Sequence, residues 1–154
     1  MKKVILLIAF TVVSFFAISQ KNYEGALGLR FGWLQNNASA GITGKLFLKE
    51  KDALEGILNY GLGTGGWLSL TVLYERHATL FDVPELNAFY GAGGGISVFE
   101  SGFNAGIDGI VGVEYTMAEI PINFSLDVKP YFNILPFGDT FHFNSALSIR
   151  YTFK

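Results

Sequence analysis

The sequence predicts an all-β fold, an eight-stranded antiparallel up-and-down transmembrane β-barrel with an N-terminal signal peptide. Three observations lead to this prediction. Apolar and polar residues alternate with a period of two along most of the chain, as in β-strands with one apolar face. The alternating runs are about as long as a tilted strand that crosses a bilayer, roughly 9 to 11 residues. Tyrosine and tryptophan recur near the ends of these runs, where a membrane barrel places aromatic residues at the water interface.

The C-terminal run 143–154, FNSALSIRYTFK, shows the alternation most clearly. One face is mainly apolar, and the other carries small and polar residues together with Arg150. The run ends on Tyr151 and Phe153, an aromatic pair that suits the surface of a bilayer better than the surface of an ordinary soluble domain. We therefore interpret this run as the membrane-crossing strand that closes the barrel.

Similar runs occur along the rest of the chain, separated by turn residues. They are Tyr23 to Trp33, Gly41 to Leu48, Leu54 to Gly63, Trp67 to Glu75, Asn87 to Phe99, Ala105 to Thr116 and Ile122 to Phe132. Together with the C-terminal run they make an even number of strands. A closed up-and-down barrel with both termini on one side needs an even number.

The composition restricts the alternatives. A chain of 154 residues has room for one domain, and its 19 glycines suit the cramped interior of a narrow barrel. Outside the N-terminus there is no continuous apolar run of about 18 residues, so the sequence does not predict a helical membrane protein. The absence of cysteine excludes disulfides and thiolate metal sites, and the net charge of −2 with no basic stripe excludes a nucleic-acid partner.

The N-terminus has the features of an export signal. Residues 1–19 contain Lys2 and Lys3, a short apolar run, and small residues at Ala17 and Ser19. We expect cleavage near Gln20, which leaves a barrel domain over residues 20–154. The alternative, a retained membrane anchor, is disfavoured because the apolar run is short and lacks a basic residue directly after it.

The strand faces opposite the apolar ones hold the charged residues, and we predict that they form a charge network inside the lumen. The residues of this network are Glu24, Arg30, Lys45, Glu55, Glu75, Asp108, Glu114, Asp127, Lys129 and Arg150. Unpaired charges in a poorly hydrated interior cost several kcal/mol each, so these side chains should pair. The pairs expected from strand order are Lys45 with Glu55, Asp108 with Lys129, and Glu24 with Arg150.

A secreted soluble β-domain would show the same alternation with its faces exchanged. The polar face argues against it, because small residues such as Ala26, Gly28 and Gly93 dominate where a water-facing surface would carry more Lys and Glu. The aromatic residues also argue against it, because they fall into two groups near the two rims. One group is Tyr23, Tyr74, Tyr90, Tyr115 and Tyr151, and the other is Trp33, Tyr60, Trp67 and Phe132.

The chain resembles the small outer-membrane β-barrel proteins of Gram-negative bacteria, the OmpX-like or general outer-membrane barrel group. The resemblance rests on the signal segment, on Asn87 to Phe99, on Gly109 to Pro130 and on the terminal SIRYTF, and it covers nearly all of the chain after the signal. It implies a monomer in the lipid of the bacterial outer membrane, inserted by the barrel assembly machinery through the C-terminal strand. One departure is Lys154, which follows the terminal aromatic residue.

The family's orientation places both termini in the periplasm. Residues 49–53, 76–86 and 117–121 then become periplasmic turns, and residues 34–40, 63–66, 100–104 and 133–140 become external loops. Because all of these loops are short, the sequence does not favour an adhesin that binds through long loops.

No motif in the sequence predicts an enzyme, a cofactor or a metal site. Gly61, Gly63 and Gly66 match a nucleotide-binding pattern, but a strand-like run follows them where that motif needs a helix. His77 has no partner that would suggest a metal site. Some barrels of this resemblance are lipid-modifying enzymes that use His and Ser near the outer rim. Here, however, the strand period puts His142 and Ser145 on opposite faces, so without a bulge in the strand they cannot act as base and nucleophile.

The pattern of Asp139 and His142 instead suggests a turn and a residue that caps the lumen. The functional prediction is a non-enzymatic outer-membrane protein with an envelope-structural role and a narrow, charge-filled lumen. Three alternatives stay open: a small pore or carrier for small solutes, a lipid-modifying outer-membrane enzyme, and a secreted soluble β-domain.

Overall fold

The computed structural model describes residues 23–34, 37–63, 65–136 and 141–154. The signal peptide predicted for residues 1–19 and the predicted turn residue Asp139 lie outside these ranges. No helix of the described residues is long and apolar enough to cross a membrane.

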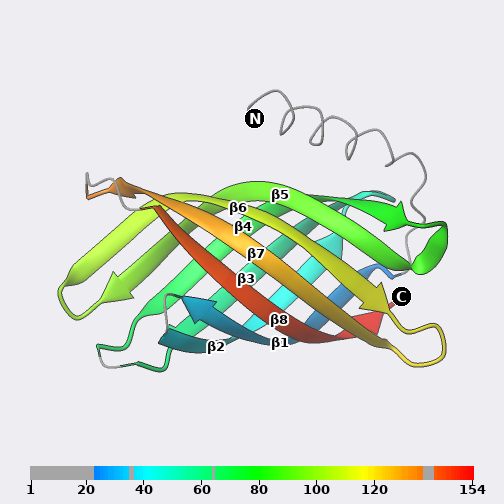
Figure 1. Cartoon of the computed structure of the whole chain (residues 1–154), viewed down its shortest axis with the longest axis horizontal. Coiled ribbons are helices and arrows are strands. Elements are labelled where there is room, and N and C mark those ends of the chain that lie inside the picture. Colours follow the sequence, from blue (N-terminus) through cyan, green and yellow to red (C-terminus); the bar gives the residue numbers. More distant parts are fainter. Residues whose placement is uncertain (1–22, 35–36, 64, 137–140) are drawn as a thin grey trace, which may run out of the picture.

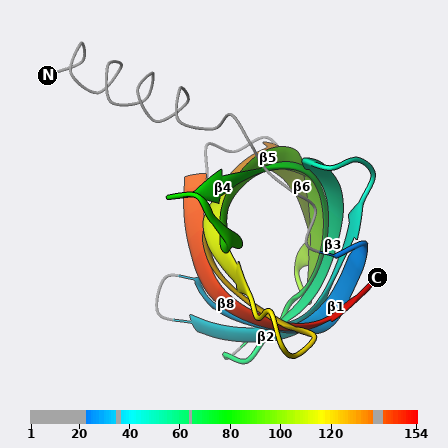
Figure 2. The same cartoon turned by 90° about the vertical axis from the view of Figure 1, so that its right-hand side faces the viewer.

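The described residues form a closed antiparallel barrel in which each strand pairs with its neighbours in sequence and the last strand pairs with the first (Figures 1 and 2). The strands are β1 (Gly25–Leu34), β2 (Asn37–Phe47), β3 (Asp52–Gly61), β4 (Leu68–Leu80), β5 (Val83–Phe99), β6 (Gly102–Thr116), β7 (Ile122–Leu135) and β8 (Phe141–Phe153). The predicted fold, an eight-stranded up-and-down barrel, is therefore confirmed.

The two ends of the barrel differ. The described chain enters at one end and leaves at the same end, where Gly25 of β1 pairs with Phe153 of β8. We call this the terminal end, and it also carries the turns β2–β3, β4–β5 and β6–β7. We call the opposite end, with the other four connections, the distal end (Figure 1).

The turn between β4 and β5 is much tighter than predicted. Leu80 pairs with Val83, so the hairpin turn consists of Phe81 and Asp82, both with positive φ (52° and 55°). Two successive residues with positive φ are typical of a type I′ turn, whose twist matches that of the two hairpin strands. The predicted turn 76–86 is therefore wrong. The sequence lacks the Asn-Gly or Asp-Gly signal by which such a turn is usually recognised.

The outer surface of the barrel is apolar. Large apolar side chains of the strands point outward and are exposed, including Leu27 at 60% and Leu126 at 57%. The interior instead holds charged and amide side chains, many of them with almost no exposure. This is the reverse of a soluble barrel, and it is stable only if the outer surface faces hydrocarbon.

Two predicted aromatic positions are wrong. Tyr23 is 2% exposed and lies inside the barrel, because the chain bends at Glu24 before β1 begins and the strand period is interrupted there. Trp67 precedes β4 with the same parity as inward-facing Ser69, and it turns inward over Gly61. The remaining predicted rim residues of both groups are exposed on the outer face.

We expect the chain without its first 19 residues to refold from urea into detergent micelles, because only an apolar surrounding can cover the outer face. The refolded protein should give a β-rich circular dichroism spectrum and should migrate differently on a gel before and after boiling. A chain that is folded and monomeric in plain buffer would contradict the membrane barrel.

Candidate functional site

The centre of the lumen toward the terminal end is occupied by an ion network around Lys45 of β2. Its Nζ lies 2.8 Å from Glu75 Oε2, 3.2 Å from Glu114 Oε2 and 3.5 Å from Glu55 Oε2. The side chain of Lys45 has 0% exposure, and those of its three partners have 0% to 1%. One ammonium group therefore contacts three buried carboxyl groups that come from β3, β4 and β6.

Arg150 of β8 extends this network across the lumen. Its Nη2 donates to Glu55 Oε1 at 2.5 Å, and its Nη1 donates to Ser125 Oγ at 2.7 Å and to Asn123 Oδ1 at 3.2 Å. Thr43 also donates a hydrogen bond to Glu55. The guanidinium is completely buried and has polar partners on several strands, as a buried charge requires.

Aromatic side chains pack on the network from the terminal end. Tyr23 donates to Glu114 at 3.1 Å, and the ring of His77 lies with its two nitrogens 3.2 Å from Glu75 and Glu114. His77 also packs between Phe47 and Phe89, with ring centroids 4.8 and 5.4 Å away. His77 falls within the predicted turn 76–86, although its parity with Glu75 on the same strand indicates an inward side chain.

Two further ion pairs lie toward the distal end. Arg30 of β1 binds Asp127 of β7 with two hydrogen bonds of 2.6 Å. Lys129 donates to Asp108 at 2.7 Å and to Thr71 at 3.0 Å. The two-pronged geometry of Arg30 and Asp127 is the strongest arrangement that an arginine and a carboxylate can adopt.

The structure places the predicted network residues inside the lumen, with the exception of Glu24. The buried ones are Arg30, Lys45, Glu55, Glu75, Asp108, Glu114, Asp127, Lys129 and Arg150. Glu24 is exposed, because the bend before β1 turns it out of the lumen. Its predicted pairing with Arg150 is therefore wrong, and Arg150 binds Glu55 instead.

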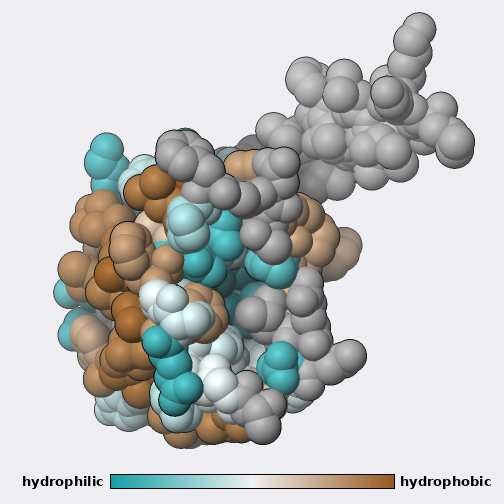
Figure 3. All heavy atoms as spheres, turned by 90° about the vertical axis from the view of Figure 1, so that its left-hand side faces the viewer, coloured by the Kyte–Doolittle hydropathy of each residue, from teal (hydrophilic) through white to brown (hydrophobic). Residues whose placement is uncertain are grey.

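The distal part of the lumen is hollow and polar. A cavity of about 400 Å³ opens there, and Figure 3, which faces this end, shows hydrophilic side chains around a hollow. Its walls carry amide, hydroxyl and aromatic groups, including Asn59, Asn133, Asn144, Trp67 and Tyr131. The ion pair of Lys129 and Asp108 also lines it.

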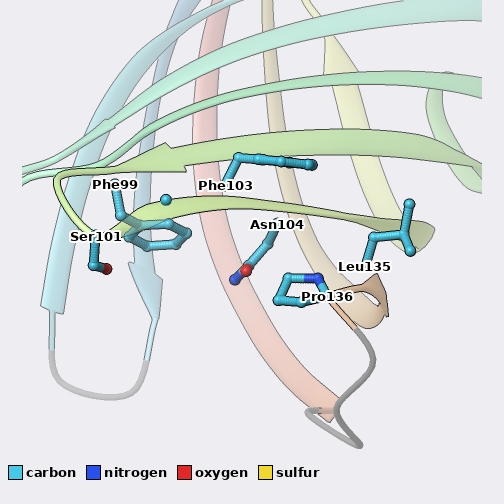
Figure 4. Close-up of a pocket in the computed structure, with 7 residues that line it drawn as sticks. Phe99, Ser101, Phe103, Asn104, Leu135 and Pro136 are labelled. Carbon is cyan, nitrogen blue, oxygen red and sulfur yellow. The ribbon is translucent and has the colours of Figure 1, made fainter.

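A second hollow of about 670 Å³ lies at the distal rim between the β5–β6 hairpin and the end of β7. Figure 4 shows Phe99, Phe103, Leu135 and Pro136 around it, so its walls are largely apolar. Phe99 and Asn104 line both this hollow and the polar cavity. The two spaces therefore adjoin at the rim.

His142 lines the polar cavity, whereas Ser145 is exposed on the outer face. The two side chains lie on opposite sides of β8, as the strand period predicts. Among the residues that the structure describes, no group of three or more His, Asp or Glu side chains has an arrangement that could hold a metal ion.

Comparison with solved structures gives likenesses in fold at low sequence identity. The N-terminal β-barrel domain of Pseudomonas aeruginosa OprF has a TM-score of 0.72 at 11% identity, covering 86% of this chain and 98% of that one. A de novo designed transmembrane β-barrel has a TM-score of 0.62 at 14% identity, covering 87% and 98%. Ail, the attachment invasion locus protein of Yersinia pestis, has 0.54 at 10% identity, covering 87% and 99%.

The fold is that of the small outer-membrane β-barrels. The predicted resemblance to the OmpX-like or general outer-membrane barrel group is confirmed at this level. No protein-family model matches the sequence, and no match is found among curated proteins. Because all three identities lie far below 25%, the likenesses concern the fold alone.

We expect Arg150→Ala to lower the free energy of unfolding by about 3 to 5 kcal/mol, because it leaves Glu55 buried without its arginine. Lys49→Ala, in the exposed β2–β3 turn, is the matched control and should have almost no effect. Urea unfolding of the two variants in detergent measures the difference. Equal urea midpoints for the two variants would mean that Arg150 does not stabilise the ion network.

Proposed function

We propose that this chain is a non-enzymatic integral protein of the bacterial outer membrane with an envelope-structural role, and that its lumen does not conduct ions. The observation that carries the proposal is the buried network of Lys45, Arg150 and their carboxylate partners. These charged side chains occupy the lumen from several strands at once. Moving a solute past them would require separating buried ion pairs, which costs several kcal/mol for each pair.

Side-chain contacts across the lumen fit a structural role. A ladder hydrogen bond links only adjacent strands, whereas Arg30 joins β1 to β7 and Lys45 joins β2 to β4 and β6. Such links resist distortion of the circular cross-section of the barrel in the bilayer. A rigid barrel with a filled lumen adds protein to the membrane without letting solutes pass through it.

A small pore or carrier is the second candidate, and one observation favours it. The polar cavity of about 400 Å³ gives solutes a space inside the distal half of the barrel. The network would have to rearrange before such a solute could reach the terminal end. A lipid-modifying enzyme has less support, because His142 and Ser145 lie on opposite faces of β8.

Planar-bilayer recording separates the plugged barrel from the pore. We expect the purified protein to give no stable openings, because the network fills the lumen at the level of Lys45. The double variant Arg30→Ala with Asp127→Ala is the matched control, since it removes one whole ion pair but leaves the Lys45 network in place, and it should also be silent. Stable openings of porin size in the unmodified protein would replace the structural role with the pore.

Deletion of the gene tests the structural role itself. We expect a deletion strain to become more sensitive to detergent and to large antibiotics that an intact outer membrane excludes, and expression of the unmodified chain should restore resistance. Lipid A from the two strains should be identical. Unchanged sensitivity would argue against the structural role, and a loss of lipid A acylation would favour the enzyme.

A further inference from the structure

The polar cavity at the distal end exists because glycines line the wall behind its amide side chains. A Cβ on Gly41 would lie 2.3 Å from Asn59 Oδ1, and one on Gly61 would lie 2.2 Å from Trp67 Nε1. The amide and the indole can therefore lie against the wall of the barrel only because these two residues have no side chain. The middle of the lumen stays open as a result, with a volume of about 400 Å³. This volume is within the usual range of small-molecule sites, roughly 300 to 1,000 Å³.

Buried oxygen atoms line this space without a protein partner. Asn59 Oδ1, Asp108 Oδ2, Asn133 Oδ1 and Asn144 Oδ1 have no hydrogen-bond partner among the described residues. The four side chains are 0% to 8% exposed, so they are shielded from bulk solvent. A ligand that donates hydrogen bonds to these oxygens would therefore be held by directed polar contacts inside the cavity.

The charge of the cavity selects against ions. Lys129 and Asp108, the charged pair in its wall, are joined at 2.7 Å and offset each other. His142 lines the same space. An anion or a cation would have to compete with an existing ion pair, whereas hydroxyl groups can donate to the carboxamide and carboxylate oxygens and accept from the amide N–H groups.

Aromatic side chains complete the wall. The cavity is lined by Trp67 from the segment before β4, Phe99 from the end of β5 and Tyr131 from β7. Aromatic faces pack against the C–H surfaces of a ring that carries hydroxyl groups at its edge. Amide groups and aromatic faces together therefore match a ligand with a polar rim and an apolar face.

We propose that the distal cavity binds a small neutral polyhydroxylated solute, of the size of a monosaccharide or a short polyol. The solute enters from the distal end and is held on the distal side of the Lys129 and Asp108 pair. The ion network around Lys45 closes the route to the terminal end, so the solute binds inside a barrel whose lumen is otherwise filled. This goes beyond the structural role, which does not require a ligand.

The chain contains a built-in reporter for this proposal. It has two tryptophans, and Trp33 is 54% exposed on the outer face while Trp67 lines the cavity. The variant Trp33→Phe leaves Trp67 as the single tryptophan, which can be excited selectively beyond the absorption of the tyrosines. It should be refolded in a detergent without a sugar headgroup, since such a headgroup could itself occupy the site. Circular dichroism and the gel shift on boiling verify that it is folded.

D-glucose, maltose and glycerol serve as neutral probes, with sodium phosphate and spermidine as the anionic and cationic probes. We expect at least one neutral probe to change Trp67 emission in a saturable way and the ionic probes to give no saturable change. The variant Trp67→Phe, which keeps Trp33, should show no response. A response to phosphate or spermidine alone, or no saturable response to any neutral probe, would overturn the proposal.

Substitution of the cavity wall adds a second test. Asn133→Leu removes an unpartnered acceptor and fills space, so it should weaken the apparent affinity about tenfold or more. Lys49→Ala, in the β2–β3 turn, should leave the affinity unchanged. If Asn133→Leu does not fold, Asn133→Ser removes the same carboxamide without adding bulk. Unchanged affinity in a folded variant at position 133 would show that the response arises elsewhere and would overturn the proposal.

Discussion

The sharing of one ammonium group, Lys45, by three buried glutamates is the interaction on which the interior depends. The apolar outer face must meet hydrocarbon, so the charged side chains of the strands can lie only in the lumen. There the carboxylates of Glu55, Glu75 and Glu114 would repel one another without the cation between them. Arg150 supplies the second cation, and together the two residues hold β2, β3, β4, β6 and β8 around one centre.

The lumen is divided by the size of its side chains. Toward the terminal end, His77 and Phe89 pack on the ion network and are 1% to 2% exposed. Toward the distal end, amides of modest size lie against glycines and leave a cavity of about 400 Å³. A barrel of this strand number has just enough interior for its side chains, so small residues at a few positions are sufficient to open a hollow. The filled terminal half and the hollow distal half of the lumen therefore both follow from the narrow interior of an eight-stranded barrel.

The likeness to OprF, at a TM-score of 0.72 and 11% identity, shows how little of the sequence the fold requires. Backbone hydrogen bonds hold each strand to the next, and the alternation of apolar and polar residues decides which side faces lipid. Many sequences satisfy both conditions. The ion network and the amide-lined cavity of the lumen depend instead on individual side chains.

The alternation in the sequence determined the strand number and the face of nearly every strand side chain, because a period of two follows directly from strand geometry. Tertiary structure alone decided which charges meet across the lumen, because parity assigns a side chain to the interior but does not say which distant strand lies opposite. Arg150 of β8 binds Glu55 of β3 for this reason, and the sequence offered no sign of that pair. A local bend likewise turned Glu24 outward and Tyr23 inward, where the strand period no longer applies.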